Sequence, residues 1–406
     1  MAYKRLGDML VSTGVISQEQ LDAALAYGKE QHARIGEALV RAADEILAGK
    51  LLDQFPLDPI QGGAGTSVNM NMNEVLSNRA LELLGEPRGR YDIVSPNNHA
   101  NMAQSTNDVF PTAIKVCLSR KAARLRAALD RLAAELERKA EAYKDILKMG
   151  RTHLQDAVPI TLGQEMGAYA SAVRRGVRRI EQAQESLHVV NMGGTAIGTG
   201  LNAEPAYIPL VSEKLSEVTG ERYVTAENLI DATNNTDVFA EMSGALKATA
   251  LVLIKMANDF RLMASGPRCG LSELKLPKRQ PGSSIMPGKV NPVIAEVLDQ
   301  ACYQAIAHDL AVTLGVENGQ FELNVMEPVI AHNLFGALNC LTNGVNTFVD
   351  KLLVDLEADE ASCKEWLDRS VGVVTALLPH IGYEQSAALA KEAYTTGKPI
   401  LQVIME

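Results

Sequence analysis

Apolar residues recur every three or four positions through several long stretches of the chain, which is the spacing of one face of an α-helix. Residues 112–148 contain neither Pro nor Gly. Pro111 precedes them and suits the first position of a helix, so the pattern predicts a helix about 55 Å long. Similar stretches cover 162–190, 238–264, 293–316 and 328–355. Long helices with short connections indicate an antiparallel bundle, and no sustained period of two requires a large sheet.

Polar residues mark several expected ends of these elements. Ser17 followed by Gln20 forms a capping-box pattern, which predicts a short amphipathic helix over residues 17–32. Thr161 with Gln164, and Asn291 before Pro292, predict the starts of two long helices. Clusters of Gly, Asn, Ser and Thr between Leu51 and Pro111 indicate loops and helix starts, and residues 358–406 indicate a small helical tail.

Composition narrows the possible functions. A chain of 406 residues suits two to four domains at about 100–200 residues each. The net charge of −10 argues against a nucleic-acid partner, because such proteins are basic. Five scattered cysteines show no zinc-site spacing and favour free thiols, and no segment suits a signal peptide or a membrane span. We therefore expect a cytoplasmic protein without membrane contact or a bound metal.

Residues 282–292, GSSIMPGKVNP, are the most informative segment. Two glycines and two prolines shape a loop that ends where a helix is expected, so free backbone N–H groups and Lys289 meet there and favour an anion. A serine beside such donors can act as a base when its alkoxide is stabilised. Taken alone, this pattern suits an ordinary flexible surface loop better.

Three further clusters, at residues 65–67, 105–108 and 150–156, place hydroxyl and amide donors at expected turns or helix ends. Together they suit a small substrate with two carboxylates, although each alone is more often a helix cap or an Asx-turn.

These motifs resemble those of the aspartase/fumarase superfamily of lyases, whose signature is the loop at 282–292. The segments at 61–74, 95–112, 150–165, 193–202 and 265–273 resemble the family in the same order. The resemblance implies an all-α fold, in which a long central helix bundle is completed by tetramerisation and flanked by small domains. It also implies active sites composed from three chains of a homotetramer, and no metal or organic cofactor.

Within the superfamily the chain is more similar to the aspartate ammonia-lyases than to the fumarases, because of Thr106 and of Glu327 before Pro328. The implied reaction eliminates ammonia from L-aspartate, a small dicarboxylate amino acid, to give fumarate. Fumarate hydratase is the alternative enzyme. A different alternative is a superfamily scaffold with weakened catalysis that acts as an interaction protein.

The resemblance also implies roles for individual residues. Ser283 is the expected base on a mobile loop, and His153 is a candidate for proton transfer or for hydrogen bonding. Substrate contacts are expected from donors in four segments: Thr66, Ser105, Thr106, Asn107, Thr152, Lys289 and Asn291. Support of the loop is expected from Gly282, Ser284, Met286 and Pro287.

The two ends of the chain depart from the family pattern. Residues 4–33 resemble the N-terminal module of type II secretion and pilus assembly ATPases, and the end is shorter than the family's. The expected domains are an atypical helical module at 1–34, a shortened lyase domain at 35–108, the bundle at 109–357 and a truncated helical domain at 358–406. A chimera joined near Ile35 and a simple helical cap on the bundle both explain the first module.

Overall fold

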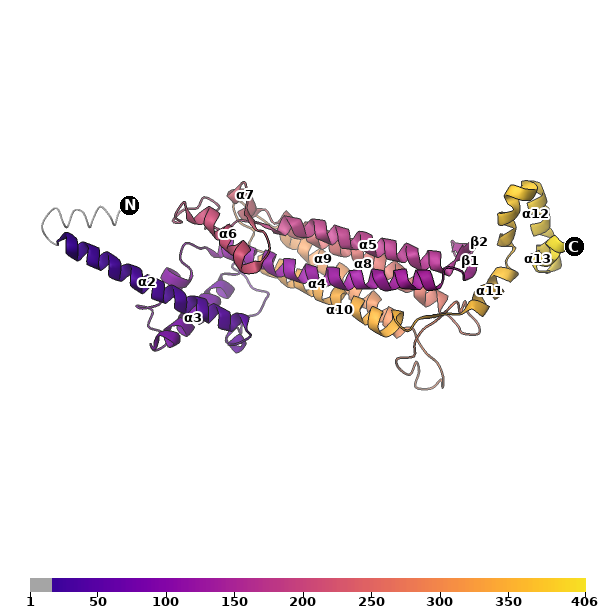
Figure 1. Ribbon diagram of the computed structural model, residues 1–406, viewed down its shortest axis with the longest axis horizontal. Helices are drawn as coiled ribbons and strands as arrows, with labels where there is room; N and C mark the ends of the chain where they lie inside the picture. The colour runs from indigo at the N-terminus through magenta and orange to yellow at the C-terminus, as the bar shows by residue number, and fades with distance from the viewer. Residues whose placement is uncertain (1–16) are drawn as a thin grey trace. The chain divides into compact units, whose positions relative to one another are not determined.

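The computed structural model describes residues 17–406, and most of this structure is helical (Figure 1). The chain forms two compact units. The first contains the described residues up to Ala113, together with Val190–Asn235 and Gly319–Pro328. The second contains Ile114–Val189, Thr236–Asn318 and Val329–Glu406. Each unit is therefore assembled from segments that lie far apart in the sequence.

The helices and strands follow in chain order. The α-helices are α2 (Gln18–Leu47), α3 (Thr66–Leu84), α4 (Thr106–Ala142), α5 (Leu162–Leu187), α6 (Tyr207–Thr219), α7 (Leu229–Asn234), α8 (Asp237–Met263), α9 (Val293–Glu317), α10 (Glu327–Phe348), α11 (Glu360–Arg369), α12 (Leu378–Thr396) and α13 (Ile400–Met405). The strands are β1 (Leu147–Thr152), β2 (Gln155–Thr161), β3 (Val189–Val190), β4 (Val224–Thr225), β5 (Leu274–Lys275) and β6 (Glu357–Ala358), and they pair as three two-stranded sheets.

Five long helices, α4, α5, α8, α9 and α10, supply the bundle that the sequence pattern predicts (Figure 1). On α4 buried leucines recur at helical spacing, and they are Leu118, Leu125, Leu129, Leu132 and Leu136. Each such leucine contributes roughly 1.5–3 kcal/mol through removal of its apolar surface from water. Tyr169, Phe260 and Phe348 link α5, α8 and α10, with ring centroids 5.8 and 5.5 Å apart. The core of the second unit therefore lies along the bundle.

The helix predicted over residues 17–32 is correct in its start and too short in its length. Ser17 and Gln20 form the expected capping box, but α2 continues to Leu47. The boundary expected between residues 34 and 35 thus lies inside α2. Ile35, Ala38 and Leu39 pack with apolar side chains of α3, and this burial holds the later turns of α2 helical.

The helix predicted over residues 112–148 begins and ends too late. α4 begins at Thr106 and ends at Ala142, and the chain then enters β1. Pro111 lies inside α4 and cannot donate to the carbonyl of Asn107. That carbonyl accepts a hydrogen bond from Asn191 Nδ2 at 3.0 Å instead, so a residue distant in sequence makes the internal proline tolerable.

The remaining long helices agree with prediction to within a few residues, except that α10 ends at Phe348 and a π-helical turn follows at Val349–Leu353. The capping box of Thr161 and Gln164 is confirmed at the start of α5. None of the helices in the described part of the chain combines the length and apolar composition needed to cross a membrane.

Candidate functional site

The helices α3 and α4 begin close together in the first unit, and four of the predicted site residues lie at their starts. Thr66 is the first residue of α3, and Thr106 is the first residue of α4. Asn69, one turn into α3, donates from Nδ2 to Thr106 Oγ1 at 3.0 Å. The structure therefore brings Thr66 together with Ser105, Thr106 and Asn107, where the positive ends of two helix dipoles favour an anion.

Gly65 permits this close approach of the two helices. It has φ of +86°, and a Cβ at this position would lie 2.6 Å from the ring of Phe110 on α4. A larger residue would have to displace the Phe110 ring, and its backbone would be strained at this positive φ. The glycine-rich sequence before α3 therefore sets the geometry at the two helix starts.

A cluster of amides supports Thr106, and sequence reasoning missed it. Asn69 and Asn73 both donate to Asn101 Oδ1, at 3.2 and 3.1 Å. Asn101 in turn donates to the carbonyl of Gln104 at 3.2 Å. The backbone before Ser105 and the hydroxyl of Thr106 are thus held by one network. The four-residue spacing of the two asparagines on α3 was the available signal, because it places both amides on one helix face.

Asp108 ties the start of α4 to residues 193–195, a role that the sequence pattern did not indicate although Asp108 lies in the predicted cluster at 105–108. Its fully buried carboxylate accepts from the backbone N–H groups of Ser105, Gly193 and Thr195 at 2.9, 3.2 and 2.9 Å. Burial raises the pKa of Asp108, while these backbone donors act in the opposite direction. Asn107 adds a hydrogen bond from Nδ2 to the carbonyl of Ala196 at 2.7 Å. The segment at 193–202 therefore supports the donors at 105–107.

The hairpin of β1 and β2 presents Thr152 and His153 in the second unit. Thr152 pairs with Gln155, so His153 and Leu154 form a two-residue turn. Both turn residues have positive φ, 52° and 60°, as a type I′ turn requires. Thr152 and His153 are exposed, which leaves their polar atoms accessible to a ligand.

The signature loop is closed at its base by two hydrogen bonds. The N–H of Gly282 donates to the carbonyl of Lys289 at 2.9 Å, and Asn291 Nδ2 donates to the carbonyl of Gly282 at 2.8 Å. The helix start predicted from Asn291 and Pro292 is confirmed, because α9 begins at Val293, but Asn291 does not cap the helix. Its side chain closes the loop, and Pro292 directly precedes α9 without a capping side chain.

Ser283 lies within this closed loop. Its Oγ accepts hydrogen bonds from the backbone N–H groups of Ile285 and Met286, each at 3.2 Å. Two backbone dipoles thus converge on one hydroxyl oxygen and favour negative charge there. The neighbouring loop residues are exposed: Ser284, Met286, Pro287 and Lys289.

The predicted site residues therefore form three groups: the two helix starts, the hairpin turn and the signature loop. The last two groups belong to the second unit. Across residues 17–406 no hydrogen bond or ion pair joins the hairpin turn to the signature loop. In the same residues no three His, Cys, Asp or Glu side chains gather closely enough to hold a metal ion.

Comparison with models of protein families identifies the family to which this chain belongs. A model described as "Lyase" matches residues 6–307, and one described as "Fumarase C C-terminus" matches residues 373–406. The chain belongs to the aspartase/fumarase family of lyases. The first match includes most of the segment at 4–33 that resembles a secretion ATPase module. Residues 4–16 of that segment lie outside the described residues, and the rest forms the cap Ser17 and the first turns of α2.

Two relatives of this chain are named aspartate ammonia-lyases, which agrees with the family assignment. Aspartate ammonia-lyase of Bacillus subtilis (strain 168) is 51% identical over 406 residues, covering 100% of this chain and 85% of the relative. Aspartate ammonia-lyase of Escherichia coli (strain K12) is 47% identical over 92% of this chain and 78% of its own.

Solved structures share the fold. The fumarate lyase:delta crystallin of Brucella melitensis, bound to cobalt, matches with a TM-score of 0.89 and 45% identity, covering 92% of this chain and 81% of its own. The class II fumarase of Schistosoma mansoni matches with a TM-score of 0.88 and 36% identity, covering 98% and 84%. The all-α fold expected from the sequence is confirmed.

Proposed function

We propose that this lyase catalyses the reversible elimination of ammonia from L-aspartate to give fumarate. Relatives named aspartate ammonia-lyase are more similar in sequence, at up to 51% identity, than the class II fumarase, at 36%. The observation that carries the proposal is the environment of Ser283, whose Oγ accepts two backbone N–H groups. A serine hydroxyl in water is a very weak acid and stays protonated near neutral pH, so it cannot take a proton from the substrate. The two N–H donors stabilise its deprotonated form, which can act as the base.

In the proposed reaction Ser283 removes a proton from the carbon beside the β-carboxylate of aspartate. The electron pair of that C–H bond moves into the β-carboxylate and forms an enediolate. The C–N bond then breaks, ammonia leaves, and the electron pair returns to form the double bond of fumarate. Closure of the loop excludes water while this intermediate exists.

The donors at the two helix starts are proposed to stabilise the enediolate. Thr66, Ser105, Thr106 and Asn107 offer hydroxyl and amide groups beside the N-termini of α3 and α4. Negative charge that develops on the β-carboxylate is stabilised most by donors already held in place. The amides that hold Thr106 and the backbone contacts of Asp108 supply that support.

The remaining groups are proposed to bind the other end of aspartate. Lys289 offers a positive charge to the α-carboxylate, and Thr152 offers a hydroxyl donor. Asn291 uses its amide nitrogen to close the loop, which leaves its carbonyl oxygen for the substrate ammonium. His153 is proposed to hydrogen-bond the same end of the substrate.

A homotetramer with composite sites is part of this proposal. Tyr303, Leu310 and Leu314 follow one face of α9 and are 52%, 62% and 51% exposed. Leu251 and Leu262 are likewise exposed on α8, which packs against α9. Apolar faces of this kind are stabilised by burial against other copies of the chain.

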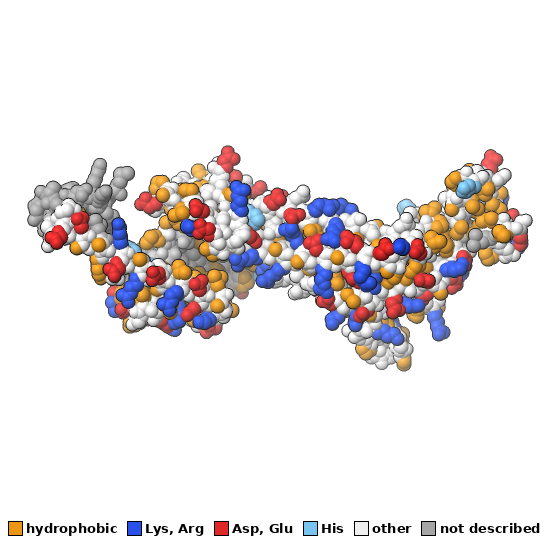
Figure 2. All heavy atoms as spheres, viewed as in Figure 1, with side chains coloured by type: hydrophobic (Ala, Val, Ile, Leu, Met, Phe, Trp, Pro, Cys, Tyr) orange, Lys and Arg blue, Asp and Glu red, His pale blue; other side chains and the backbone are white. Residues whose placement is uncertain are grey.

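The outer surface of α4 and α5 differs from that apolar face. Arg174 pairs with Asp130 at 2.6 Å and with Glu137 at 3.1 Å. In Figure 2, acidic and basic side chains alternate along this part of the bundle. Such a surface suits contact with water.

We further propose that the enzyme acts in the cytoplasm, where its five cysteines stay as the thiols seen here.

The test is ultraviolet absorbance of fumarate when the purified protein meets L-aspartate, with L-malate in parallel. Fumarate from aspartate alone is expected. Fumarate from malate alone would replace the proposal with fumarate hydratase. No product from either substrate, from a folded tetramer, would favour a scaffold that acts as an interaction protein.

Two single variants test the base. Ser283→Ala is expected to lower kcat by about 10²- to 10⁴-fold, because the proton acceptor is lost. Ser284→Ala is the matched control in the same loop, and it should keep most of the activity because its hydroxyl is exposed. Gel filtration should show the same assembly for both. If Ser283→Ala stays active while Ser284→Ala does not, the base is assigned to the wrong serine.

A further inference from the structure

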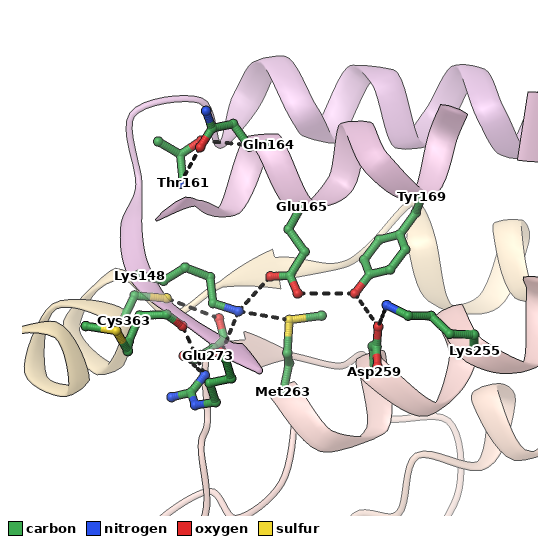
Figure 3. A network of polar contacts seen from close by, with 12 residues as sticks. Lys148, Thr161, Gln164, Glu165, Tyr169, Lys255, Asp259, Met263, Glu273 and Cys363 are labelled. Carbon is green, nitrogen blue, oxygen red and sulfur yellow. Dashed lines mark hydrogen bonds and ion pairs between the residues drawn. The ribbon is translucent and has the colours of Figure 1, made fainter. Parts of the chain in front are cut away.

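A network of charged side chains lies beneath the hairpin, and the proposed mechanism uses none of it (Figure 3). Its centre consists of Lys148 on β1, Glu165 on α5 and Glu273 just before β5. Tyr169 extends it toward α8, because its hydroxyl lies 3.2 Å from Glu165 Oε1 and 2.7 Å from Asp259 Oδ2. The network therefore joins the hairpin to two helices of the bundle.

Glu273 bridges the irregular part of β1. Its side chain is fully buried, with Oε1 2.8 Å from Arg151 Nη1 and Oε2 2.9 Å from Lys148 Nζ. The register of the two strands shifts between Met149 and Arg151, so the two basic residues lie on opposite sides of a bulge. One carboxylate thus determines how the strand continues beyond the bulge toward the turn.

The backbone of Glu273 is itself anchored to the bundle. Its N–H donates to the carbonyl of Met263, at the end of α8, at 2.7 Å. Its carbonyl accepts from the N–H of Asp359, just before α11, at 2.9 Å. The backbone of Glu273 is therefore held in place, and its carboxylate contacts the hairpin from a fixed position.

Arg151 is followed directly by Thr152 and by the His153–Leu154 turn. Both turn residues have a left-handed backbone without being glycine, and such strain persists only where the surroundings enforce it. The contact between Glu273 and Arg151 lies next to this turn and is largely shielded from water, because the Arg151 side chain is only 16% exposed.

We propose that Glu273 is a positioning residue, which acts through Arg151 to hold Thr152 and His153 where they grip the substrate. This inference rests on the proposed function. The two hairpin residues touch the substrate, whereas Glu273 acts only by fixing the strand that carries them. A misplacement of about 1 Å in such a group is enough to cost about 10²-fold in rate.

Glu165 provides a matched control. It is the other carboxylate on Lys148, with its Oε2 2.6 Å from Nζ, and it makes no ion pair with Arg151. Glu165→Gln removes one negative charge from the same network and leaves the Arg151–Glu273 contact in place. A general weakening of the network would affect Glu165→Gln and Glu273→Gln alike, whereas positioning through Arg151 affects only the second.

The experiment compares Glu273→Gln, Glu165→Gln and Arg151→Gln in steady-state turnover of L-aspartate and in thermal unfolding. Glu273→Gln and Arg151→Gln are each expected to lower kcat/KM by about 10-fold or more, with KM raised and kcat lowered. The double variant should lose no more than either single variant, because both act on one contact. Glu165→Gln should stay within about threefold of wild type.

Amide hydrogen exchange at the hairpin turn measures the positioning without relying on activity. Faster exchange at residues 152–155 in Glu273→Gln, with little change in Glu165→Gln, is expected. Unchanged exchange and unchanged kinetics in Glu273→Gln would overturn the inference, and so would equal losses in both glutamate variants. If Glu273→Gln does not fold, Arg151→Gln tests the same contact, and wild-type activity in that variant would overturn it. An inactive wild type would instead refute the proposed function.

Discussion

Single buried polar residues determine how the donors of the candidate site are held. Asp108 is the clearest example, because one carboxylate accepts three backbone N–H groups from two segments more than eighty residues apart in the chain. The neighbouring Ser105, Thr106 and Asn107 carry the proposed substrate contacts. Asp108 does not touch the substrate in the proposed mechanism, but it holds in place the residues that do.

Asp108→Asn tests this role. The amide keeps one acceptor oxygen and replaces the other with a donor that faces backbone N–H groups. The free energy of unfolding is expected to fall by about 1–3 kcal/mol, and KM for aspartate should rise. Urea unfolding and steady-state kinetics measure both quantities.

Asp237 supplies the control for Asp108, because it lies in the first turn of α8 and is exposed. Asp237→Asn should change the free energy of unfolding by no more than about 0.5 kcal/mol. Equal effects of the two substitutions would show that the charge near a helix start matters, and that the buried backbone contacts do not.

Close approach between elements determines how the hairpin leaves α4 and enters α5. Gly163, in the first turn of α5, donates its N–H to the carbonyl of Tyr143 at 2.9 Å. A Cβ on Gly163 would lie 2.4 Å from the carbonyl oxygen of Ala140. The start of α5 thus packs directly on the backbone at the end of α4. This contact fixes the two ends of the hairpin that connects the helices.

Gly163→Ala is expected to destabilise the protein by about 1–3 kcal/mol, because the backbone of α4 has to move. Gly167→Ala is the control one turn further along the same helix. Its Cβ would meet only Ala140 Cβ, at 3.8 Å, so it should stabilise the helix by about 0.5–1 kcal/mol. Thermal unfolding of both variants checks the opposite signs, and two shifts of the same sign would contradict this account of the packing.

At the scale of the whole molecule, the proposed function has the three groups of site residues acting together in an assembly of several chains. The exposed apolar faces of α8 and α9 are the surfaces proposed to form it. No hydrogen bond or ion pair joins the hairpin turn to the signature loop within residues 17–406, and the proposed assembly has each of them facing residues of other copies.

Mixed tetramers test the composite site. Thr152→Val and Ser283→Ala each disable one group, and since Thr152 is exposed and Ser283 lies half-buried in a loop, neither should disturb the packing of the bundle. If the two groups of one site come from different chains, co-refolding the two variants in equal amounts should restore about one quarter of wild-type activity. Each variant refolded alone is the control. Absence of any recovery from verified mixed tetramers would show that one chain supplies both groups.

The sequence by itself determined the features that depend on neighbours within a few positions. The apolar spacing predicted the long helices, the pairs Ser17–Gln20 and Thr161–Gln164 marked two helix starts, and the loop at 282–292 carried the resemblance to the lyase family. These rules are local, since a capping hydroxyl or an apolar stripe acts within one or two turns.

Only the tertiary structure decided the features that depend on distant partners. Pro111 lies inside α4 because Asn191 takes the carbonyl that the proline cannot bond. α2 extends to Leu47 because its later turns pack on α3. The strand β1 follows α4 and is held by Glu273, more than a hundred residues away in sequence. In each case burial or a hydrogen bond from a remote segment outweighs a local preference, and such contacts exist only once the chain has folded.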